Sequence, residues 1–373
     1  MTSRSGGTDG PADTDFPGTS TTMTEKLSQN RNSRLANKPW HVKKQDGIGS
    51  ETVSKRYVGI DLGGTNLKLG LVSADGRILE RLSTPTEAQA GPDHVLARMA
   101  QAVRDLCAKA GIGLADVAAV GVGSPGPLDS KAGVVLFTPN MAGWNNVPVR
   151  DTLQAELGRP VVLENDANAA AYGEFRCGAG RAVRNMFLLT LGTGVGGGIV
   201  LDGRLFRGTT DTGAELGHII VQHNGRRCGC GNHGCLEAYA SATAVVGRLA
   251  EAMAAGEATH LPAGKDVTCK DIFDAAAAGD RLAARIVEET AEYLAIGITS
   301  ILHVLNPEMV VLTGGMMGAG DAFLDQVRRH VGRTAFESAR KGCGICWSTL
   351  GGDAGILGAA LAAEAFDRTG QPA

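Results

Sequence analysis

The chain has 373 residues, of which 43% are hydrophobic, and its formal net charge at pH 7 is −3. This length accommodates two domains with proper cores, and the small net charge gives no electrostatic reason to expect nucleic acid or a membrane as partner. We find no signal peptide and no apolar run long enough to cross a bilayer. Glycine is frequent, with 53 residues. This fits either turns that bring backbone close to a ligand or repeated tight hairpins.

The eight cysteines do not form a regular disulfide pattern. Three lie together between residues 228 and 235, and the others are scattered: Cys107, Cys177, Cys269, Cys343 and Cys346. We therefore expect reduced thiols and a cytoplasmic protein. The lone C-x-x-C from Cys343 to Cys346 is interpreted as a reduced pair near a strand rather than as a redox centre.

Residues 1–55 are rich in Ser, Thr, Gly and Asn and show no apolar periodicity, which predicts a disordered tail. A transit peptide is the alternative interpretation. Asp9, Asp13 and Asp15 argue against it, because such peptides avoid acidic residues.

Order is predicted to begin at Tyr57. The segments YVGIDL, LKLGLVS and RILERLST alternate with a GGTN turn and an Asp75-Gly76 hairpin, which predicts three antiparallel strands. The elements expected next are a helix over 92–110, a strand over 117–123, a short strand GVVLF, a helix from Pro148 to Leu157, and a buried strand from 160 that ends at NDAN, where another helix starts.

Residues 185–206 repeat the strand, glycine turn, strand and Asp-Gly hairpin of the first half. Leu62 to Thr65 and Leu191 to Gly194 occupy equivalent places. A duplicated domain with a ligand-binding cleft follows from this repeat. We expect a small lobe over 56–170, completed by a C-terminal helix over 352–368, and a large lobe over 171–351.

The chain after the repeat is predicted to be mainly helical. The expected elements are helices over 236–255, 268–279 and 281–302, a buried strand EMVVLTGG, a helix over 321–338, and a closing helix, GDAGILGAALAAEAF. The small residues of this closing helix allow it to pack close to neighbouring backbone.

The segment TGAELGHIIVQHNGRRCGCGNHGCLEAYAS, residues 212–241, carries the strongest chemical signal. Three thiolates and one imidazole are the set that closes a tetrahedral, structural zinc site. The preferred ligands are His218, Cys228, Cys230 and Cys235. His223 and His233 are alternative nitrogen ligands, and a metal-free glycine-rich loop is the remaining interpretation.

Two carboxylates lie beside these ligands in the sequence, Glu215 and Glu237. If zinc takes one ring nitrogen of His218, the other N–H is held as a donor. An oriented imidazole with two carboxylates suits a small polyhydroxylated molecule such as a sugar.

Two segments match G-x-G-x-x-G, Gly121 to Gly126 and Gly192 to Gly197. Neither is a dinucleotide site, because the first runs into prolines and the second into a strand rather than a helix. No P-loop pattern is present. The matching glycine turns of the two halves instead favour phosphate binding through backbone N–H groups, the alternative being two ordinary hairpins.

Asp61 and Asp166 both stand at the ends of predicted strands. Asp61 could hold Mg²⁺ through water beside nucleotide phosphates, or merely stabilise its turn. Asp166 could act as a base toward a substrate hydroxyl, whereas either it or Asn165 could simply be the helix N-cap.

The motifs DLGGTNLKLG, ENDANAAAYGE, LGTGVGGGIV, ELGH and CGCGNHGCLE together resemble the ROK family of bacterial sugar kinases and sugar-responsive repressors. The resemblance covers residue 57 to the end, and within the family the chain is most similar to glucokinases. It implies an actin-like, hexokinase-like (ribonuclease H-like) α/β fold of two lobes. It also implies transfer of the γ-phosphoryl of Mg-ATP to the 6-hydroxyl of glucose.

The resemblance also implies roles for individual residues. Asp166 would be the catalytic base, and the sugar would be bound by Asn140, Asn165, Asp166, Glu215, His218 and Glu237. ATP would be bound by Asp61 with Mg²⁺, by Gly63, Gly64, Thr65 and Asn66, by Thr193, Gly194, Gly196 and Gly197, and by Gly314 and Gly315. The family's zinc ligands fall on the preferred set given above.

Several alternatives stay open at this stage. A repressor of the same family would need a helix-turn-helix ahead of the sugar domain, and residues 1–55 show no periodicity for one. An actin-like ATPase would have no use for the zinc loop. Among kinases, N-acetylmannosamine, N-acetylglucosamine, mannose or fructose could replace glucose, and polyphosphate could replace ATP. The family suggests a homodimer.

Overall fold

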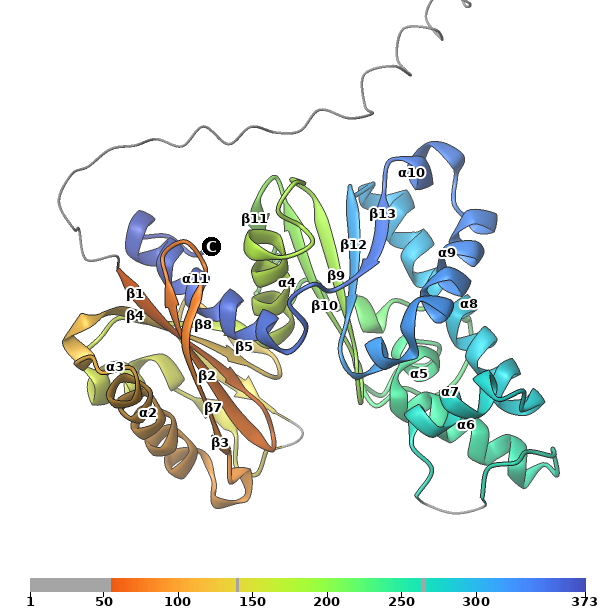
Figure 1. Cartoon of the computed structure of the whole chain (residues 1–373), viewed down its shortest axis with the longest axis horizontal. Coiled ribbons are helices and arrows are strands. Elements are labelled where there is room, and N and C mark those ends of the chain that lie inside the picture. Colours follow the sequence, from red (N-terminus) through yellow and green to blue (C-terminus); the bar gives the residue numbers. More distant parts are fainter. Residues whose placement is uncertain (1–54, 139–140, 263–265) are drawn as a thin grey trace, which may run out of the picture. The chain divides into compact units, whose positions relative to one another are not determined.

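A computed structural model describes residues 55–138, 141–262 and 266–373 (Figure 1). The described residues belong to one compact unit. The predicted tail therefore lies, apart from Lys55, outside the described residues, and so does Asn140. In the part of the chain that is described, no helix is both long and apolar enough to span a membrane.

The first sheet contains five strands in the order β3-β2-β1-β4-β8. Their bounds are β1 Arg56–Leu62, β2 Asn66–Ser73, β3 Ile78–Pro85, β4 Val117–Ser124 and β8 Val161–Asn165. The pairs β1–β2 and β2–β3 are antiparallel, as predicted from the hairpins, whereas the pairs β1–β4 and β4–β8 are parallel.

The second sheet has the order β11-β10-β9-β12-β13 and the same pattern of strand directions. Its strands are β9 Met186–Leu191, β10 Val195–Leu201, β11 Arg204–Leu205, β12 Met309–Thr313 and β13 Gly344–Trp347. The duplication predicted from the sequence repeat is confirmed. A small third sheet consists of β5 Leu128–Asp129, β6 Val134–Phe137 and β7 Asn145–Val147, of which only β6 was predicted.

The two faces of the first sheet are covered by different helices (Figure 1). Helices α2 (Pro92–Lys109) and α3 (Val149–Leu157) pack on one face, against alternate strand residues such as Val58 and Ile60. On the opposite face lies α11 (Ala354–Thr369), which follows the last strand of the second sheet. Helix α4 (Asp166–Cys177) follows the last strand of the first sheet, and the strands that it contacts most are β9 and β10 of the second sheet. Each half of the repeat thus supplies a helix to the other.

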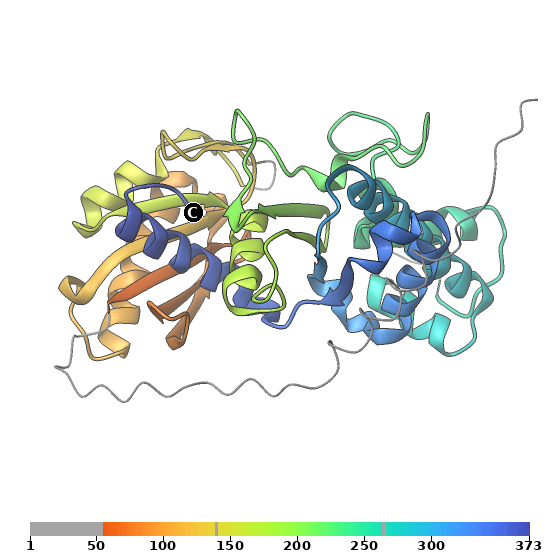
Figure 2. The same ribbon diagram turned by 90° about the horizontal axis from the view of Figure 1, so that it is seen from above.

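Helices α4 and α11 cross in close contact (Figure 2). A Cβ added at Gly358 would overlap the Ala169 carbonyl, and one at Gly173 would overlap the Ala354 carbonyl. Gly59 of β1 is equally close to the Ile356 carbonyl. The prediction that the closing helix packs against backbone is therefore confirmed, and the absence of side chains is what permits this packing.

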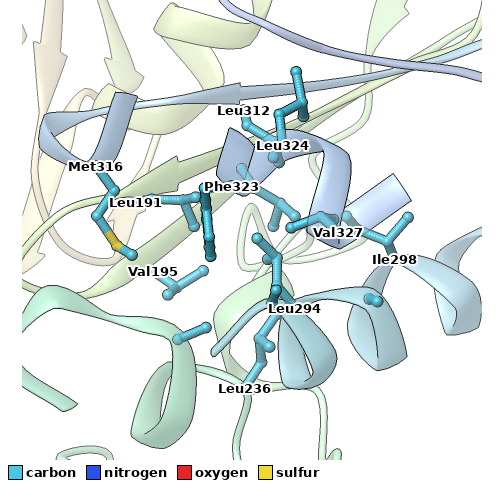
Figure 3. Packing of buried hydrophobic residues seen from close by; sticks show 14 of the residues in the cluster. Leu191, Val195, Leu236, Leu294, Ile298, Leu312, Met316, Phe323, Leu324 and Val327 are labelled. Carbon is cyan, nitrogen blue, oxygen red and sulfur yellow. The ribbon is translucent and has the colours of Figure 1, made fainter. Parts of the chain in front are cut away.

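The second sheet packs against a helical layer through an apolar core that includes Leu191, Val195, Leu294 and Phe323 (Figure 3). The helices of this half are α5 Glu237–Ala240, α6 Ala242–Ala254, α7 Cys269–Ala277, α8 Arg281–Leu305, α9 Gly320–Thr334 and α10 Glu337–Lys341.

Two helices predicted as continuous are interrupted. Ser241 adopts an extended conformation between α5 and α6, and its hydroxyl accepts a hydrogen bond from Ala244 N at 3.1 Å, so it caps a new helix. Ala335 and Phe336 are likewise extended between α9 and α10. The predictions of single helices over 236–255 and 321–338 were therefore wrong.

Candidate functional site

A cavity of about 440 Å³ is lined by both halves of the repeat. The first half contributes the end of β1, part of β2 and the start of α4. The second half contributes the ends of β9 and β12, the glycine pair after β12 and the start of α11. The lining residues that carry the chemical argument are Asp61, Lys68, Asp166, Thr190, Gly314 and Gly315.

Asp61 and Thr190 reach this cavity from equivalent places in the repeat. Each residue lies one position before the last residue of its strand, β1 or β9. The Thr190 hydroxyl accepts a hydrogen bond at 3.0 Å from Gly196 N of the neighbouring strand β10, and this bond fixes the orientation of the hydroxyl. One half of the repeat thus presents a carboxylate where the other presents a hydroxyl.

Asp61 faces Lys68, its direct partner on the neighbouring strand β2. Burial raises the pKa of the Asp61 carboxyl, and the positive charge of Lys68 works against this shift. Gly355 of α11 lies against the same carboxylate, because a Cβ there would be 3.3 Å from Asp61 Cγ. The cavity therefore contains a desolvated carboxylate with a lysine beside it.

Asp166 is the first residue of α4 and is half-buried at the cavity wall. Desolvation by the surrounding protein raises the pKa of its carboxyl to about 6, and the negative charges of Asp61 and Glu215 add to the shift. Its hydrogen bond from Ala167 N, at 2.8 Å, opposes it. A carboxylate with a pKa in this range is suited to accept a proton near neutral pH.

Asn165 performs the capping role that the sequence left open between it and Asp166. Its side-chain oxygen accepts hydrogen bonds from Ala167 N at 2.9 Å and from Asn168 N at 3.1 Å. Capping by Asn165 holds the end of β8 and the first turn of α4 together.

The beginnings of two helices contribute to the cavity wall. Ala167 lies in the first turn of α4, and Ala354 and Gly355 lie in the first turn of α11. The first N–H groups of a helix lack intrahelical partners, and the helix dipole favours negative charge at this end. The cavity is thus suited to an anion such as a phosphate.

The two glycine turns lie beside the cavity rather than in its wall. The first turn, Gly63 to Asn66, is closed by a hydrogen bond from Gly63 N to Asn66 O at 3.1 Å, and Gly64 and Thr65 are exposed. In the second turn, which contains Thr193 and Gly194, Gly192 N donates to Gly194 O at 3.0 Å. The two turns follow the strand ends that carry Asp61 and Thr190, respectively.

Two glycines of strand β10 take part in packing. Gly196 pairs with Thr190 across the sheet, and a Cβ at Gly197 would lie 2.5 Å from the Ala214 carbonyl oxygen. Gly197 thereby allows the segment that leads to Glu215 to lie directly on the strand.

The predicted zinc ligands lie together. One ligand atom from each of His218, Cys228, Cys230 and Cys235 lies within 4.8 Å of the others. The Sγ atoms of Cys230 and Cys235 are 3.7 Å apart, as are Cys228 Sγ and His218 Nδ1. Tetrahedral coordination with Zn–S bonds of ~2.3 Å needs ligand separations of about this size, so the donor set fits zinc. The alternative ligands His223 and His233 are not in this group.

The two glutamates beside the zinc loop have different surroundings. Glu215 Oε2 lies 3.9 Å from His218 Nε2, the ring nitrogen that faces away from Cys228. Glu237 accepts a hydrogen bond from Val195 N at 3.0 Å and lies 3.4 Å from Cys228 Sγ. Glu237 thus connects the zinc loop to the second glycine turn, while Glu215 is exposed and available to a ligand.

The structure brings some of the predicted site residues around one cavity and leaves others beside it. Asp61, Asp166, Gly314 and Gly315 line the cavity, whereas Glu215, Glu237 and His218 are not part of its wall. Lys68 was missed from the sequence, although strand alternation after the glycine turn places its side chain on the same face as Asp61.

A model of the ROK family matches residues 57–365. The chain is 40% identical over 309 residues to a glucokinase of Thermotoga maritima, a match that covers 82% of this chain and 96% of that protein. It is 35% identical over 305 residues to an N-acetylmannosamine kinase of Citrobacter koseri, covering 82% and 97%.

Solved structures give matches of similar extent. A ROK hexokinase from Thermus thermophilus has a TM-score of 0.71 at 36% identity, covering 84% of this chain and 99% of that one. A ROK family glucokinase from Streptomyces griseus in complex with glucose and AMPPNP has a TM-score of 0.70 at 35% identity, covering 83% and 99%. A ROK family transcriptional regulator, a homologue of the E. coli MLC protein, has a TM-score of 0.74 at 28% identity, covering 83% and 78%.

Proposed function

Because this chain belongs to the ROK family, we propose that it is an ATP-dependent sugar kinase that transfers the γ-phosphoryl of Mg-ATP to the 6-hydroxyl of glucose, giving glucose 6-phosphate. The observation that carries this proposal is the position of Asp166. Its carboxyl, with a raised pKa, shares one cavity with the N-terminal ends of two helices. A proton acceptor beside an anion-binding wall is what phosphoryl transfer to a hydroxyl requires.

ATP is proposed to bind with its phosphates in this cavity. The helix dipoles favour negative charge at the beginnings of α4 and α11, of which α11 has no side-chain cap, and the Lys68 ammonium adds a positive charge. The exposed turn at Gly63, Gly64, Thr65 and Asn66 and the turn at Thr193 and Gly194, with Gly196 and Gly197 after it, flank the phosphates. Gly314 and Gly315 leave room for the adenosine side.

Mg²⁺ is proposed to lie near Asp61, where its charge would neutralise phosphate oxygens. Asp61 suits this role because its carboxylate lines the cavity proposed for the phosphates, and carboxylate oxygens are ligands that Mg²⁺ prefers.

The sugar is proposed to bind beside the cavity, between Asp166 and the zinc loop. Asn165, Glu215, His218 and Glu237 would contact its hydroxyls, together with Asn140, which lies outside the described residues. The influence of the Glu215 charge on the pKa of Asp166 supports their closeness. In this arrangement Asp166 would accept the proton of the 6-hydroxyl as the new P–O bond forms and the bond from the γ-phosphorus to the β-phosphate oxygen breaks, which releases ADP. A base of this kind contributes ~10²- to 10⁴-fold to the rate.

Zinc is proposed to be structural, bound by His218, Cys228, Cys230 and Cys235, and it would supply a rigid support rather than a reacting group. Because His218 Nε2 points toward Glu215, the bound metal would fix both side chains for the sugar. We also propose that residues 56–170 with α11 and residues 171–351 act as two lobes, and that the protein is a cytoplasmic homodimer.

The decisive test is an ADP-release assay with Mg-ATP across glucose, fructose, mannose, N-acetylglucosamine and N-acetylmannosamine, with zinc quantified on the same sample. We expect turnover with glucose and about one zinc per chain. Preference for N-acetylmannosamine would move the assignment to the activity named for the Citrobacter koseri relative. Formation of glucose 6-phosphate when polyphosphate replaces ATP, measured directly on the product, would change the proposed donor. If no sugar is phosphorylated, the remaining interpretation of the protein is a sugar-binding regulator.

A further inference from the structure

A buried ion pair joins β8, the strand that leads into the proposed base, to the loop that follows β11. Arg207 Nε donates to Glu164 Oε2 at 2.8 Å, and Nη2 donates to the same oxygen. The side chain of Glu164 is 2% exposed and that of Arg207 is 13% exposed. Burying two charges has a large desolvation cost, so such a pair is retained only with good geometry and further hydrogen bonds.

Glu164 has these further bonds, and they lead to the proposed base. Its other oxygen, Oε1, accepts from Asn165 N and from Asn168 Nδ2, both at 3.1 Å. These two residues flank Asp166 on the turn from β8 into α4. The Glu164 carboxylate therefore braces both sides of the turn on which Asp166 sits.

Arg207 is in turn built into the loop that ends at Glu215. Its Nη1 donates to Ala373 O at 2.7 Å, and its own carbonyl accepts from Gly213 N at 2.9 Å, which closes the loop on itself. The next residue, Ala214, is buried against Gly197 of β10, and Glu215 follows it directly. The position of Glu215 and the orientation of its side chain thus depend on where Arg207 is held.

A second contact fixes the same loop from the first half of the chain. Asp211 Oδ2 accepts hydrogen bonds from Ser130 N at 2.9 Å and Ser130 Oγ at 2.7 Å, next to β5. The loop is therefore held at two points by residues of the first half, and Glu164 is the point that also touches the Asp166 turn.

We propose that Glu164 and Arg207 are positioning residues that set the distance between Asp166 and Glu215, and thereby the placement of the sugar hydroxyl relative to its base. This inference rests on the proposed kinase function. Neither residue contacts the proposed phosphate cavity. Their effect should therefore appear in the kinetics of the sugar and not in those of Mg-ATP.

The test compares the wild-type protein with the double variant Glu164→Gln and Arg207→Met. Removing both charges together avoids leaving one buried charge without a partner, so the variant should fold. Glutamine keeps an acceptor for Asn165 N and Asn168 Nδ2. We expect kcat/KM for glucose to fall about tenfold to a hundredfold, since small displacements of reacting groups have effects of this size. KM for Mg-ATP should stay within about twofold.

Three further variants make the result specific. Arg207→Lys keeps the charge and should recover part of the loss. Arg184→Met removes an exposed ion pair with Asp202, which lies in the hairpin between β10 and β11, and should leave the kinetics unchanged. In a Glu215→Gln background the double substitution should cost about threefold or less, because residues that act through one another are not additive.

Unchanged glucose kinetics in a folded double variant would overturn the inference while leaving the kinase function in place. An equal rise in KM for glucose and in KM for Mg-ATP would also overturn it, since that would indicate a general structural role. A wild-type protein that phosphorylates no sugar would instead remove the proposed function, and the positioning role with it.

Discussion

Asp61 and Lys68 are direct partners across the antiparallel pair β1 and β2, and both residues line the cavity that contains Asp166. Side chains of directly opposed residues lie on the same face of a sheet. The lysine therefore partly compensates a carboxylate whose pKa burial raises. It also places positive charge where the phosphates of ATP are proposed to bind.

Replacing Lys68 with methionine tests this role. We expect kcat/KM for Mg-ATP to fall about tenfold to a hundredfold, because the variant loses a charge-assisted hydrogen bond to phosphate in a partly buried site. The KM for glucose should change little. Lys109→Met, which removes a lysine that pairs with Glu80 on the edge strand β3, is the matched control. The measurement is steady-state kinetics with each substrate varied in turn. If kcat/KM for Mg-ATP is the same in the two variants, Lys68 does not contact the phosphates.

The pKa of Asp166 predicts the acid side of the pH profile. A base must be unprotonated, so activity is present above its pKa and is lost as the pH falls through about 6. We expect kcat/KM for glucose to decrease tenfold per pH unit below this value. The measurement is an initial-rate series from pH 5 to 8. A profile that stays flat down to pH 5 would contradict the assignment of Asp166 as the base.

The same carboxylate should also reduce stability. Its folded-state pKa lies above the usual value, so the folded protein carries an unfavourable charge above pH 6, and this penalty disappears when the group is protonated in both states below about pH 4. Asp166→Asn should therefore raise the free energy of unfolding by about 1 to 3 kcal/mol at pH 7.5 while nearly abolishing turnover.

Thermal unfolding at pH 7.5 and pH 5 checks this expectation, because the advantage of the asparagine variant should shrink at the lower pH. A variant less stable than the wild type at pH 7.5 would show that favourable contacts of the carboxylate outweigh its desolvation.

The zinc loop makes a separate prediction. Cys230 is the exposed member of the four-ligand group, so Cys230→Ser should lose the metal. We expect KM for glucose to rise by about tenfold or more, because His218 and Glu215 lose their support, while KM for Mg-ATP changes little. Zinc content and both KM values are measured together. Cys343→Ser, in a thiol outside the loop, is the control, and a zinc-free protein with normal glucose KM would argue against the supporting role.

Much of the fold could be predicted because its signals are local. Strand alternation, the two Asp-Gly hairpins and the repeated glycine turns define both sheets, and apolar periodicity defines most helices. The breaks at Ser241 and at Ala335 were missed, since helix-forming residues surround them and only the capping hydroxyl of Ser241 signals the first break. The closing helix was expected to complete the first lobe, whereas the reciprocal packing of α4 on β9 and β10 depends on the whole chain and has no local signature.

The site shows the same limit. The four zinc ligands could be proposed because they lie within eighteen residues of sequence and follow a known donor pattern. By contrast, Arg207 and Glu164 are 43 residues apart, and nothing in the sequence indicates that they pair. Lys68 lay within a motif that was already recognised, but its contribution became visible only when the register placed it opposite Asp61.

The crossing of α4 and α11 links this packing to the site, because both helices begin at the cavity. Gly358→Ala places a methyl group against the Ala169 carbonyl of α4, where backbone cannot move aside without shifting the helix. We expect a loss of about 1 to 3 kcal/mol in stability, together with reduced kcat from displacement of Asp166.

Gly247→Ala, in the interior of α6 where an added Cβ meets no atom within 4 Å, is the matched control. It should instead gain about 0.5 to 1 kcal/mol, because alanine is the better helix former. Thermal unfolding and glucose turnover of both variants test the argument. If Gly358→Ala is as stable and active as the wild type, the two helices have room to separate, and their close crossing does not fix the geometry of the cavity.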